Sequence, residues 1–216
     1  MSSLEVVRLR RTSDTTARLT LTRPARRNAI NAQLATEFAQ AVTTIEEWGV
    51  HVAILDAEGP AFCAGVDLSE LDTGGASLKS VVESILSSPV HWTAVVQGAA
   101  RGGALEVLAA CPRVLAGTSA TFGLPELSKG FFPTDLMRSQ IASLGMRRAF
   151  GLAFSATPID AAQALRMGLI SDVVADHQLA EHASDLARAL ATVDAEGLRA
   201  GISLWQSVVR DSTLAN

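Results

Sequence analysis

The sequence predicts an α/β fold, with a core of repeated ββα units and a helical C-terminal part. The sequence has a short, continuous apolar run at residues 52–55 and a mostly apolar run at 92–96. Both are typical of strands that are buried on both faces of a sheet. Apolar residues at helical spacing lie between these runs, and helical spacing predominates after residue 135. Strands that alternate with helices early in a chain, followed mainly by helices, favour this architecture.

The first quarter of the chain is expected to hold a strand pair, a helix and a buried strand. Loose alternation of apolar and polar side chains predicts the pair, with a turn at Ser13-Asp14 and an end at Pro24. Residues 31–48 then carry apolar side chains at helical spacing, and Gly49 supplies a stop signal. The strands expected here are residues 6–10, 17–22 and 52–55.

Further along the chain, short strands again alternate with helices. A loop follows the apolar run 92–96, and Gly102 opens a helix that continues to Ala110. The other elements expected are helices at 78–86, 135–144, 147–154, 160–167, 180–191 and 198–209, and strands at 114–116, 120–122 and 170–174. No repeat, low-complexity segment or Pro/Ser-rich linker divides the chain, so residues 1–216 are expected to form a single domain. In it, residues 1–155 are the ββα core and residues 156–216 the helical C-terminal part.

The composition is that of an ordinary globular protein. The 216 residues are 48% apolar and 19% charged, and the net charge of −4 does not favour non-specific nucleic-acid binding. Cys63 and Cys111 lie among apolar residues without CxxC spacing, which favours reduced, buried thiols over a disulfide or a metal site. The sequence has no signal-peptide pattern and no apolar run of the roughly 20 residues that cross a bilayer. We therefore expect a cytoplasmic protein.

Two glycine-containing loops stand directly after buried strands, at residues 58–67 and 97–106. Small residues let a ligand approach the backbone, and the start of a helix offers unpaired N–H groups. Two such loops on neighbouring strands can aim two N–H donors at one oxygen, as an oxyanion requires. Tight structural turns explain either loop about as well. The sequence has no GxGxxG, P-loop or GxSxG motif, which disfavours a dinucleotide fold, a P-loop and a serine-hydrolase elbow.

Two glutamates stand among apolar residues and are the candidate acid/base groups. Glu106 lies in an otherwise apolar helix, and Glu126 follows Pro125 in another apolar stretch. Buried carboxyls whose pKa is raised suit proton transfer. The alternative is that each glutamate caps a backbone group or pairs with an arginine.

Two other polar features are less informative. The arginines between Arg23 and Arg27 form either a solvated basic turn or a phosphate-contact site, because arginine forks onto phosphate oxygens. The four histidines lack metal-ligand spacing, and His177 and His182, in a polar helical region, are best interpreted as solvated surface residues.

Taken together, these segments resemble the crotonase (enoyl-CoA hydratase/isomerase) superfamily, as a short, C-terminally trimmed member. Five motifs occur in the family's order from about Leu19 to Val174. They are the N-terminal signature at 19–31, the first oxyanion loop at 62–68, the second at 98–106, the second glutamate segment at 122–126 and the late helical signature at 158–170. The resemblance implies a crotonase-like fold.

The resemblance also implies site residues. The backbone N–H groups of Ala64 and Gly103 would form the oxyanion hole for a thioester carbonyl, and Glu106 and Glu126 would be the catalytic carboxylates. Arg26 would meet a CoA phosphate. The acyl-thioester and adenine region would be lined by Ala64, Gly65, Val66 and Asp67.

The family also implies the partners. The substrate would be an acyl-CoA or acyl-carrier-protein thioester, with coenzyme A as part of the substrate and with no metal or other cofactor. Members with this fold usually form trimers or dimers of trimers.

The sequence departs from the family pattern in four places. Residues 129–136 lack the Gly-rich stretch that usually follows Glu126, and Asp135 stands one residue late for the aspartate of hydroxyacyl-CoA hydrolases. Arg101 replaces a usually apolar residue, and the stretch from 67 to 97 is short. The last one or two helices of longer members are expected to be missing after residue 209.

The leading hypothesis is hydration or dehydration of an α,β-unsaturated or β-hydroxy acyl thioester, because both glutamates are present. An enoyl-CoA isomerase and a hydroxyacyl-CoA hydrolase are the enzyme alternatives. A different class is a weakly catalytic accessory crotonase that assists a biosynthetic partner enzyme.

Overall fold

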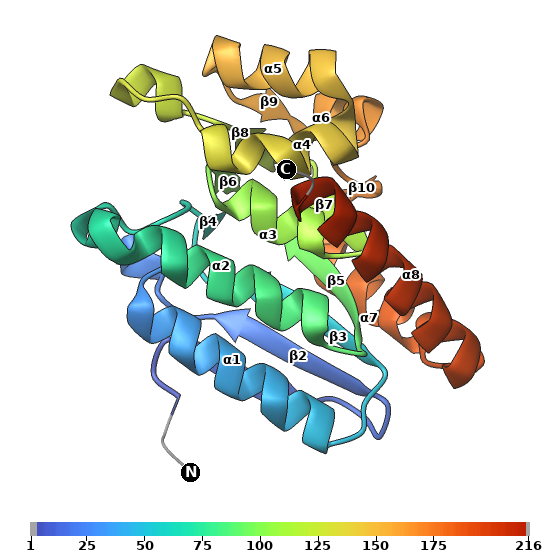
Figure 1. The fold of residues 1–216 in the computed structure, drawn as a ribbon. Helices are drawn as coiled ribbons and strands as arrows, with labels where there is room; N and C mark the ends of the chain where they lie inside the picture. Colours follow the sequence, from blue (N-terminus) through green and yellow to red (C-terminus); the bar gives the residue numbers. More distant parts are fainter. Residues whose placement is uncertain (1–3, 215–216) are drawn as a thin grey trace.

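The computed structural model describes residues 4–214, and the side chains of all of these except residues 71–76 and 212–214. Two β-sheets form the framework, and helices pack against them (Figure 1). The predicted α/β class is therefore confirmed. No helix in this described part is both long and apolar enough to cross a membrane.

The larger sheet has six strands in the order β1-β2-β3-β5-β7-β10. The pair β1–β2 is antiparallel, as predicted, and every other neighbour in this sheet is parallel. Its strands are β1 (Val7–Arg11), β2 (Thr16–Leu21), β3 (Val52–Ala57), β5 (His91–Val96), β7 (Arg113–Gly117) and β10 (Asp172–Val174). The two apolar runs are β3 and β5, and all six residues of β5 are buried, as expected for a central parallel strand.

The smaller sheet has four short strands in the order β4-β6-β8-β9. They are β4 (Ala61–Cys63), β6 (Ala99–Arg101), β8 (Thr121–Gly123) and β9 (Ile159–Asp160). β4 and β6 are parallel neighbours that follow β3 and β5 of the larger sheet, and this places the two glycine-containing loops side by side.

Eight helices pack on the sheets within residues 4–214. They are α1 (Ala32–Glu47), α2 (Leu71–Ser87), α3 (Ala104–Ala110), α4 (Met137–Leu144), α5 (Met146–Ser155), α6 (Ala161–Met167), α7 (Leu179–Leu190) and α8 (Ala195–Leu214). Local signals begin two of them: the Asn31 side chain accepts a hydrogen bond from Leu34 N–H, and Asp160 forms a capping box with Gln163.

The larger sheet is covered on both faces. On one face, Phe38 of α1 and Trp92 of β5 belong to the main core, where their rings stack with centroids 6.1 Å apart. On the other face, the apolar residues of α7 pack on alternate residues of the strands. This second core comprises Val52, Ile54, Val95, Leu115, Leu179, Ala183 and Ala187. Helices on both faces explain why β3 and β5 are apolar without alternation.

The structure corrects several expected boundaries. The loop 59–67 contains β4, and β6 precedes the double glycine, so α3 begins at Ala104 instead of Gly102. Gly102 has a φ of 54°, in the left-handed region, which a right-handed helix cannot include. The last helix is longer than the predicted 198–209. Residues 156–216 are not purely helical either, because they supply β9 and also β10, which pairs with β7.

Candidate active site

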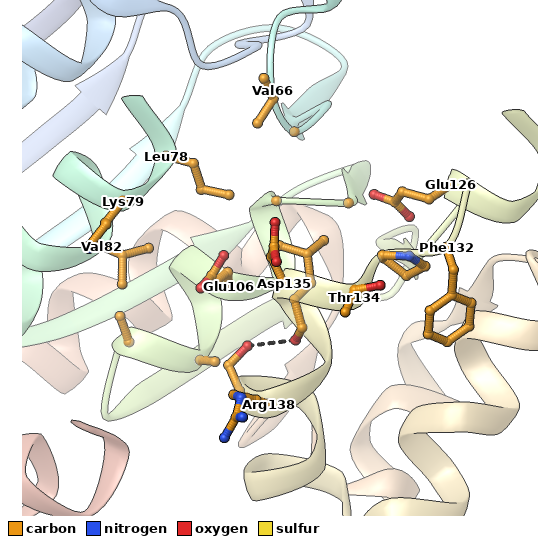
Figure 2. A pocket seen from close by; sticks show the side chains of 18 of the residues that line it. Val66, Leu78, Lys79, Val82, Glu106, Glu126, Phe132, Thr134, Asp135 and Arg138 are labelled. Atoms are coloured by element: carbon orange, nitrogen blue, oxygen red, sulfur yellow. Dashed lines mark hydrogen bonds between the residues drawn. The ribbon is translucent and has the colours of Figure 1, made fainter. Parts of the chain in front are cut away.

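A cavity of about 730 Å³ lies where the two glycine-containing loops meet α2, α3 and residues 125–139 (Figure 2). Its wall includes six of the predicted site residues: Ala64, Gly65, Val66, Gly103, Glu106 and Glu126. Arg26 and Asp67 are not part of that wall. The predicted centre therefore assembles in one place, while two of the predicted substrate contacts lie outside it.

The two loops touch at Gly65. This glycine has a φ of 89°, and a Cβ atom there would lie 2.8 Å from the carbonyl oxygen of Arg101 and 3.1 Å from the backbone nitrogen of Gly103. A side chain would collide with the second loop, so glycine is required for the close approach. The contact brings the backbone after Gly65 next to the start of α3.

The first predicted oxyanion donor is wrong. The N–H of Ala64 donates a 2.9 Å hydrogen bond to the carbonyl oxygen of Arg27, so it is not available to a ligand. Residues 65–67 pair with Ile30 like a parallel strand: Ile30 N–H donates to Gly65 O, and Asp67 N–H donates to Ile30 O, each at 2.8 Å. The N–H of the intervening residue, Val66, therefore points the other way.

On the cavity wall, two backbone N–H groups of the glycine-containing loops have no protein acceptor among residues 4–214. They belong to Val66 and to Gly103, the residue that precedes α3. The prediction for Gly103 fits this arrangement, and Val66 takes the place assigned to Ala64. Unpaired N–H donors beside a cavity can bind an oxygen that gains negative charge.

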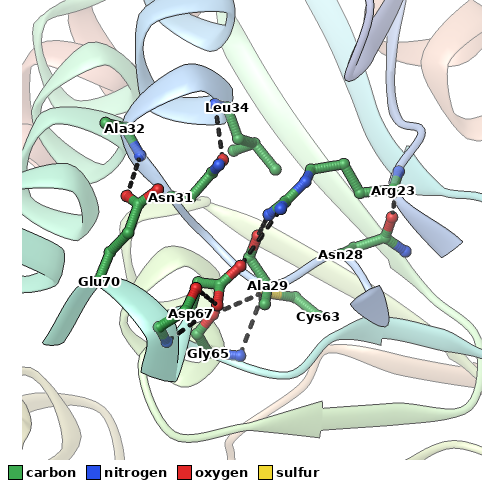
Figure 3. Close-up of polar contacts among 11 residues, drawn as sticks. Arg23, Asn28, Ala29, Asn31, Ala32, Leu34, Cys63, Gly65, Asp67 and Glu70 are labelled. Atoms are coloured by element: carbon green, nitrogen blue, oxygen red, sulfur yellow. Dashed lines mark hydrogen bonds and ion pairs between the residues drawn. The ribbon is translucent and has the colours of Figure 1, made fainter. Parts of the chain in front are cut away.

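A buried polar network holds the first loop from behind (Figure 3). The guanidinium of Arg23 lies 3.2 Å from the carboxylate of Asp67 and also donates to the carbonyl oxygen of Ala29. The hydroxyl of Ser69 donates to Asp67 at 2.7 Å, and the bonds from Ser69 and Arg23 lower the pKa of that carboxyl. Asp67 is therefore an ionised anchor of the loop.

Asn28 completes this network. It is fully buried in the left-handed conformation, with a φ of 54°, which asparagine tolerates better than most residues. Its side-chain amide nitrogen donates to the carbonyl oxygens of Glu58 and Ala61, both at 2.9 Å. Its side-chain oxygen accepts a 2.8 Å hydrogen bond from the backbone N–H of Arg23. Sequence reasoning missed the roles of Arg23 and Asn28, although an asparagine after a basic turn was a usable signal. Arg26 lies exposed on the 3₁₀ turn Pro24–Arg26.

Glu106 lies in the first turn of α3 and faces the cavity (Figure 2). Burial, and then the negative charge of Asp135, raise the pKa of Glu106 to about 7. The carboxyl therefore exchanges a proton readily near neutral pH, as an acid/base group should.

Glu126 follows Pro125 and begins the 3₁₀ turn Glu126–Lys129. Its side chain is only 7% exposed, and its Oε2 atom has no hydrogen-bond partner in the described part of the chain. Its Oε1 atom lies against Gly102, so that any Cβ there would collide with it. Burial raises the pKa of Glu126, opposed by its own backbone N–H and by Lys129. Within residues 4–214, neither glutamate forms an ion pair with an arginine.

The unusual segment after Glu126 shapes the rest of the site. Gly130 has a φ of 90°, and the turn Thr134–Leu136 brings Asp135 onto the cavity wall. Phe132 packs against α5 in a cluster with Phe150 and Phe154, with ring centroids 5.4 to 6.0 Å apart. Asp135 was not predicted as a site residue; it lies beside Glu106 in Figure 2.

An apolar branch of the cavity extends along α2. Leu78, Val82 and Leu86 recur on every fourth residue of that helix and span about 12 Å along its axis. The opposite wall is small, with Ala109 and Ala110 of α3. These side chains give this part of the wall the polarity that a hydrocarbon chain requires.

Helix α8 closes the far end of the branch with Val209 and Arg210. The indole N–H of Trp205 donates to the carbonyl oxygen of Ala110 at 3.2 Å, which docks α8 on α3. Arg210 also forms a 2.6 Å ion pair with Glu83 of α2. The chain's own last described helix thus covers part of the site.

The remaining predictions concern cysteines and metals. Cys63 and Cys111 are both free and buried, as expected, and burial raises the pKa of each thiol to about 12. Among the described residues, no group of three or more His, Cys, Asp or Glu side chains is placed to hold a metal ion.

The fold and the site together define a crotonase-type enzyme. The chain belongs to the enoyl-CoA hydratase/isomerase family, whose model matches residues 11–211.

Curated relatives carry hydratase names. The chain is 32% identical over 191 residues to the mevalonyl-coenzyme A hydratase sidH of Aspergillus fumigatus, which covers 84% of this chain and 71% of that protein. It is 33% identical over 189 residues to the 2,3-dehydroadipyl-CoA hydratase of Escherichia coli, and the match covers 80% of this chain and 71% of that protein. With the mitochondrial enoyl-CoA hydratase domain-containing protein 3 of Rattus norvegicus, the identity is 31% over 194 residues, covering 85% and 64%.

Solved structures confirm the predicted crotonase-like fold. An enoyl-CoA hydratase from Mycobacterium smegmatis superposes with a TM-score of 0.88 at 23% identity, over 98% of this chain and 90% of that one. The human enoyl-coenzyme A hydratase domain-containing protein 3 also gives 0.88, at 24% identity, over 94% and 84%.

Proposed function

We propose that this chain hydrates an α,β-unsaturated acyl thioester, or dehydrates the β-hydroxy form, through an enolate held in an oxyanion hole. One observation carries the proposal. The backbone N–H groups of Val66 and Gly103 have no protein acceptor within residues 4–214, and they lie on the same cavity wall as Glu106 and Glu126. The hydratase names of relatives at about 30% identity support the reaction class.

The two N–H groups act on the thioester carbonyl. When water adds to Cβ, the π electrons of the C=C bond move toward the carbonyl, and its oxygen gains negative charge. Fixed donors stabilise that charge without reorganisation, and removing one such donor typically costs 10²- to 10³-fold in rate.

The two glutamates move the protons. In dehydration, one carboxylate removes the proton from Cα while the protonated carboxyl of the other delivers a proton to the departing β-hydroxyl. In hydration the same two transfers run in reverse, so in both directions the pair carries one proton in total. The raised pKa values of Glu106 and Glu126 suit this exchange. The chemistry uses no resident metal or redox cofactor.

The substrate is an acyl-CoA or an acyl-carrier-protein thioester, with the acyl chain along Leu78, Val82 and Leu86. Coenzyme A is part of that substrate, and the exposed Arg26 is the proposed contact for one of its phosphates. Short and medium enoyl-CoA thioesters of fatty acid metabolism are the first compounds to test.

The chain is proposed to form a homotrimer or a dimer of trimers. Large apolar side chains are exposed around the 3₁₀ turn after Pro125 and on α5, where Phe131 is 47%, Met146 66% and Phe154 61% exposed. Burial of such side chains between subunits would stabilise an oligomer. Native mass spectrometry tests the stoichiometry. The free, buried thiols fit a reducing compartment, and we propose the cytoplasm, which cell fractionation tests.

Steady-state assay of crotonyl-CoA with the wild-type protein, Glu106→Gln and Glu126→Gln tests the reaction. Loss of hydration in both variants supports the pair, and normal turnover without either carboxylate contradicts it. Two glutamates on one cavity wall favour hydration over isomerisation. Related isomerases often use a single carboxylate, at the position of Glu126. Release of free CoA would instead identify a hydrolase. Failure to turn over any simple acyl-CoA, together with co-purification and activation of a partner enzyme, would favour an accessory protein.

A further inference from the structure

Asp135 is a further carboxylate on the cavity wall, in addition to Glu83, Glu106 and Glu126. It lies in the turn Thr134–Leu136, it is exposed to solvent, and it lies beside Glu106 on the cavity wall (Figure 2). The hydration chemistry described above gives it no direct part in bond making. Two neighbouring carboxyls on the wall of one cavity cannot both be ionised without cost, because their like charges repel.

Other charged groups also line the cavity. Lys79 and Glu83 come from α2, Arg138 from α4, Arg210 from α8, and Glu126 and Lys129 from the 3₁₀ turn. Glu83 is neutralised by its ion pair with Arg210. Asp135 is the charge that acts most strongly on Glu106, and it opposes ionisation.

We propose that Asp135 is a positioning residue that acts through Glu106 to keep the single proton that Glu106 and Glu126 share during turnover. The proposal rests on the proposed hydration and dehydration. With one proton on the pair, either glutamate can be the acid while the other is the base. With none, no group can protonate the leaving hydroxyl or the enolate carbon, and the reaction stops.

If Asp135 acts in this way, it helps to set the pH above which the rate of hydration falls. Burial and Asp135 together raise the pKa of Glu106 to about 7, so the shared proton is lost as the pH rises through that value. Removing the charge of Asp135 stabilises the ionised form of Glu106, so the proton is then lost at a lower pH. The rate defect of such a variant must therefore grow with pH, whereas a purely structural defect is the same at every pH.

The test is the pH profile of kcat/KM for crotonyl-CoA hydration in wild type, Asp135→Asn and Asp135→Glu. We expect the alkaline limb of the kcat/KM profile of Asp135→Asn to shift to a pH lower by about 0.5 unit or more. On the acid side, the activity should stay near that of the wild type. Asp135→Glu should restore the limb. Asp185→Asn, on the exposed surface of α7, changes the net charge equally and should leave the profile unchanged. A loss of equal size at every pH would overturn the proposal.

A second readout needs no turnover. Glutamate labelled with ¹³C at the side-chain carboxyl gives the titration of Glu106, assigned by its absence in Glu106→Gln. A lower titration midpoint in folded Asp135→Asn supports the proposal, and an unchanged midpoint overturns it. If the wild-type protein hydrates nothing while the midpoint still moves, the proposed function fails and the coupling between Asp135 and Glu106 stands.

Discussion

Arg23 and Asp67 form a buried ion pair, with Nη2 of Arg23 3.2 Å from Oδ2 of Asp67, directly beside the residue whose N–H faces the cavity. Asp67 N–H also donates to Ile30 O at 2.8 Å, so the ion pair and the backbone pairing fix the same segment. The orientation of Val66 N–H thus depends on residues that do not line the cavity themselves.

Asp67→Asn is therefore expected to weaken both folding and turnover. Arg23 loses its charged partner in a buried site, and breaking a buried pair in this way costs about 3 kcal/mol of the free energy of unfolding. A displaced Val66 N–H should also lower kcat. Urea unfolding and steady-state kinetics measure the two effects.

The ion pair between Arg113 and Asp172, at 2.8 Å, provides the matched control. It joins β7 to β10, and each of its side chains is about one third exposed. Asp172→Asn should cost about 1 kcal/mol or less and leave kcat unchanged. Equal losses of kcat in Asp67→Asn and Asp172→Asn would show that the Arg23–Asp67 pair has no special role in the site.

Glu106→Gln should make the stability of the protein less dependent on pH. The pKa of Glu106 is about 7 when folded and near 4.5 ordinarily, so the folded state binds more protons between these values. The wild-type protein therefore loses stability as the pH rises from about 4.5 to 7, by about 1–3 kcal/mol from this group. Urea unfolding at pH 5 and pH 8 checks this. The free energy of unfolding of the variant should rise relative to that of the wild type at pH 8 but not at pH 5. A difference that does not change with pH would contradict the burial of an ionisable Glu106.

Gly102→Ala should abolish activity by displacing Glu126. A Cβ on Gly102 would collide with Oε1 of that carboxylate, and the φ of 54° adds strain. Gly49→Ala is the control, because Gly49 also has a positive φ, of 67°, but nothing lies within 4 Å of its Cβ position. Both variants should lose about 1 kcal/mol or more of stability. Only Gly102→Ala should lose turnover, which crotonyl-CoA kinetics measure.

Ala109→Leu should shorten the range of acyl chains that the enzyme accepts. Ala109 lines the apolar branch opposite α2, and a larger side chain fills the space beyond the reacting carbons. We expect kcat/KM to fall at least tenfold for medium-chain enoyl-CoA thioesters and to stay within about threefold for crotonyl-CoA. An equal loss for both lengths would place the acyl chain elsewhere.

Much of the fold could be predicted from the sequence because its signals are local. The apolar runs gave β3 and β5, and Asn31 and Gly49 bounded α1 correctly. The strands β4, β6 and β9 have only two or three residues each, too few to show a period, and they form because neighbouring strands pair with them.

The candidate site could be predicted only in part, because some of its features depend on contacts between distant segments. Small residues in a loop drew attention to Ala64. Which N–H is free, however, depends on the pairing of Gly65 and Asp67 with Ile30, which lies 35 and 37 residues earlier in the chain. Asp135 stands in an exposed, irregular segment whose turn is set by packing of Phe132 on α5. Contacts between distant segments decide both features, and a single sequence carries no direct record of them.

The central claim is that backbone N–H groups of Val66 and Gly103 bind the thioester oxygen. Gly103 permits a direct test, because its φ of −54° suits proline and its N–H has no acceptor within residues 4–214. Gly103→Ala and Gly103→Pro both place a Cβ against the flexible side chain of Leu78, but only proline removes the N–H. The decisive measurement is the ratio of kcat/KM for crotonyl-CoA hydration in these two folded variants. The oxyanion hole predicts that Gly103→Pro is slower than Gly103→Ala by about 10²-fold or more, and equal rates would contradict it.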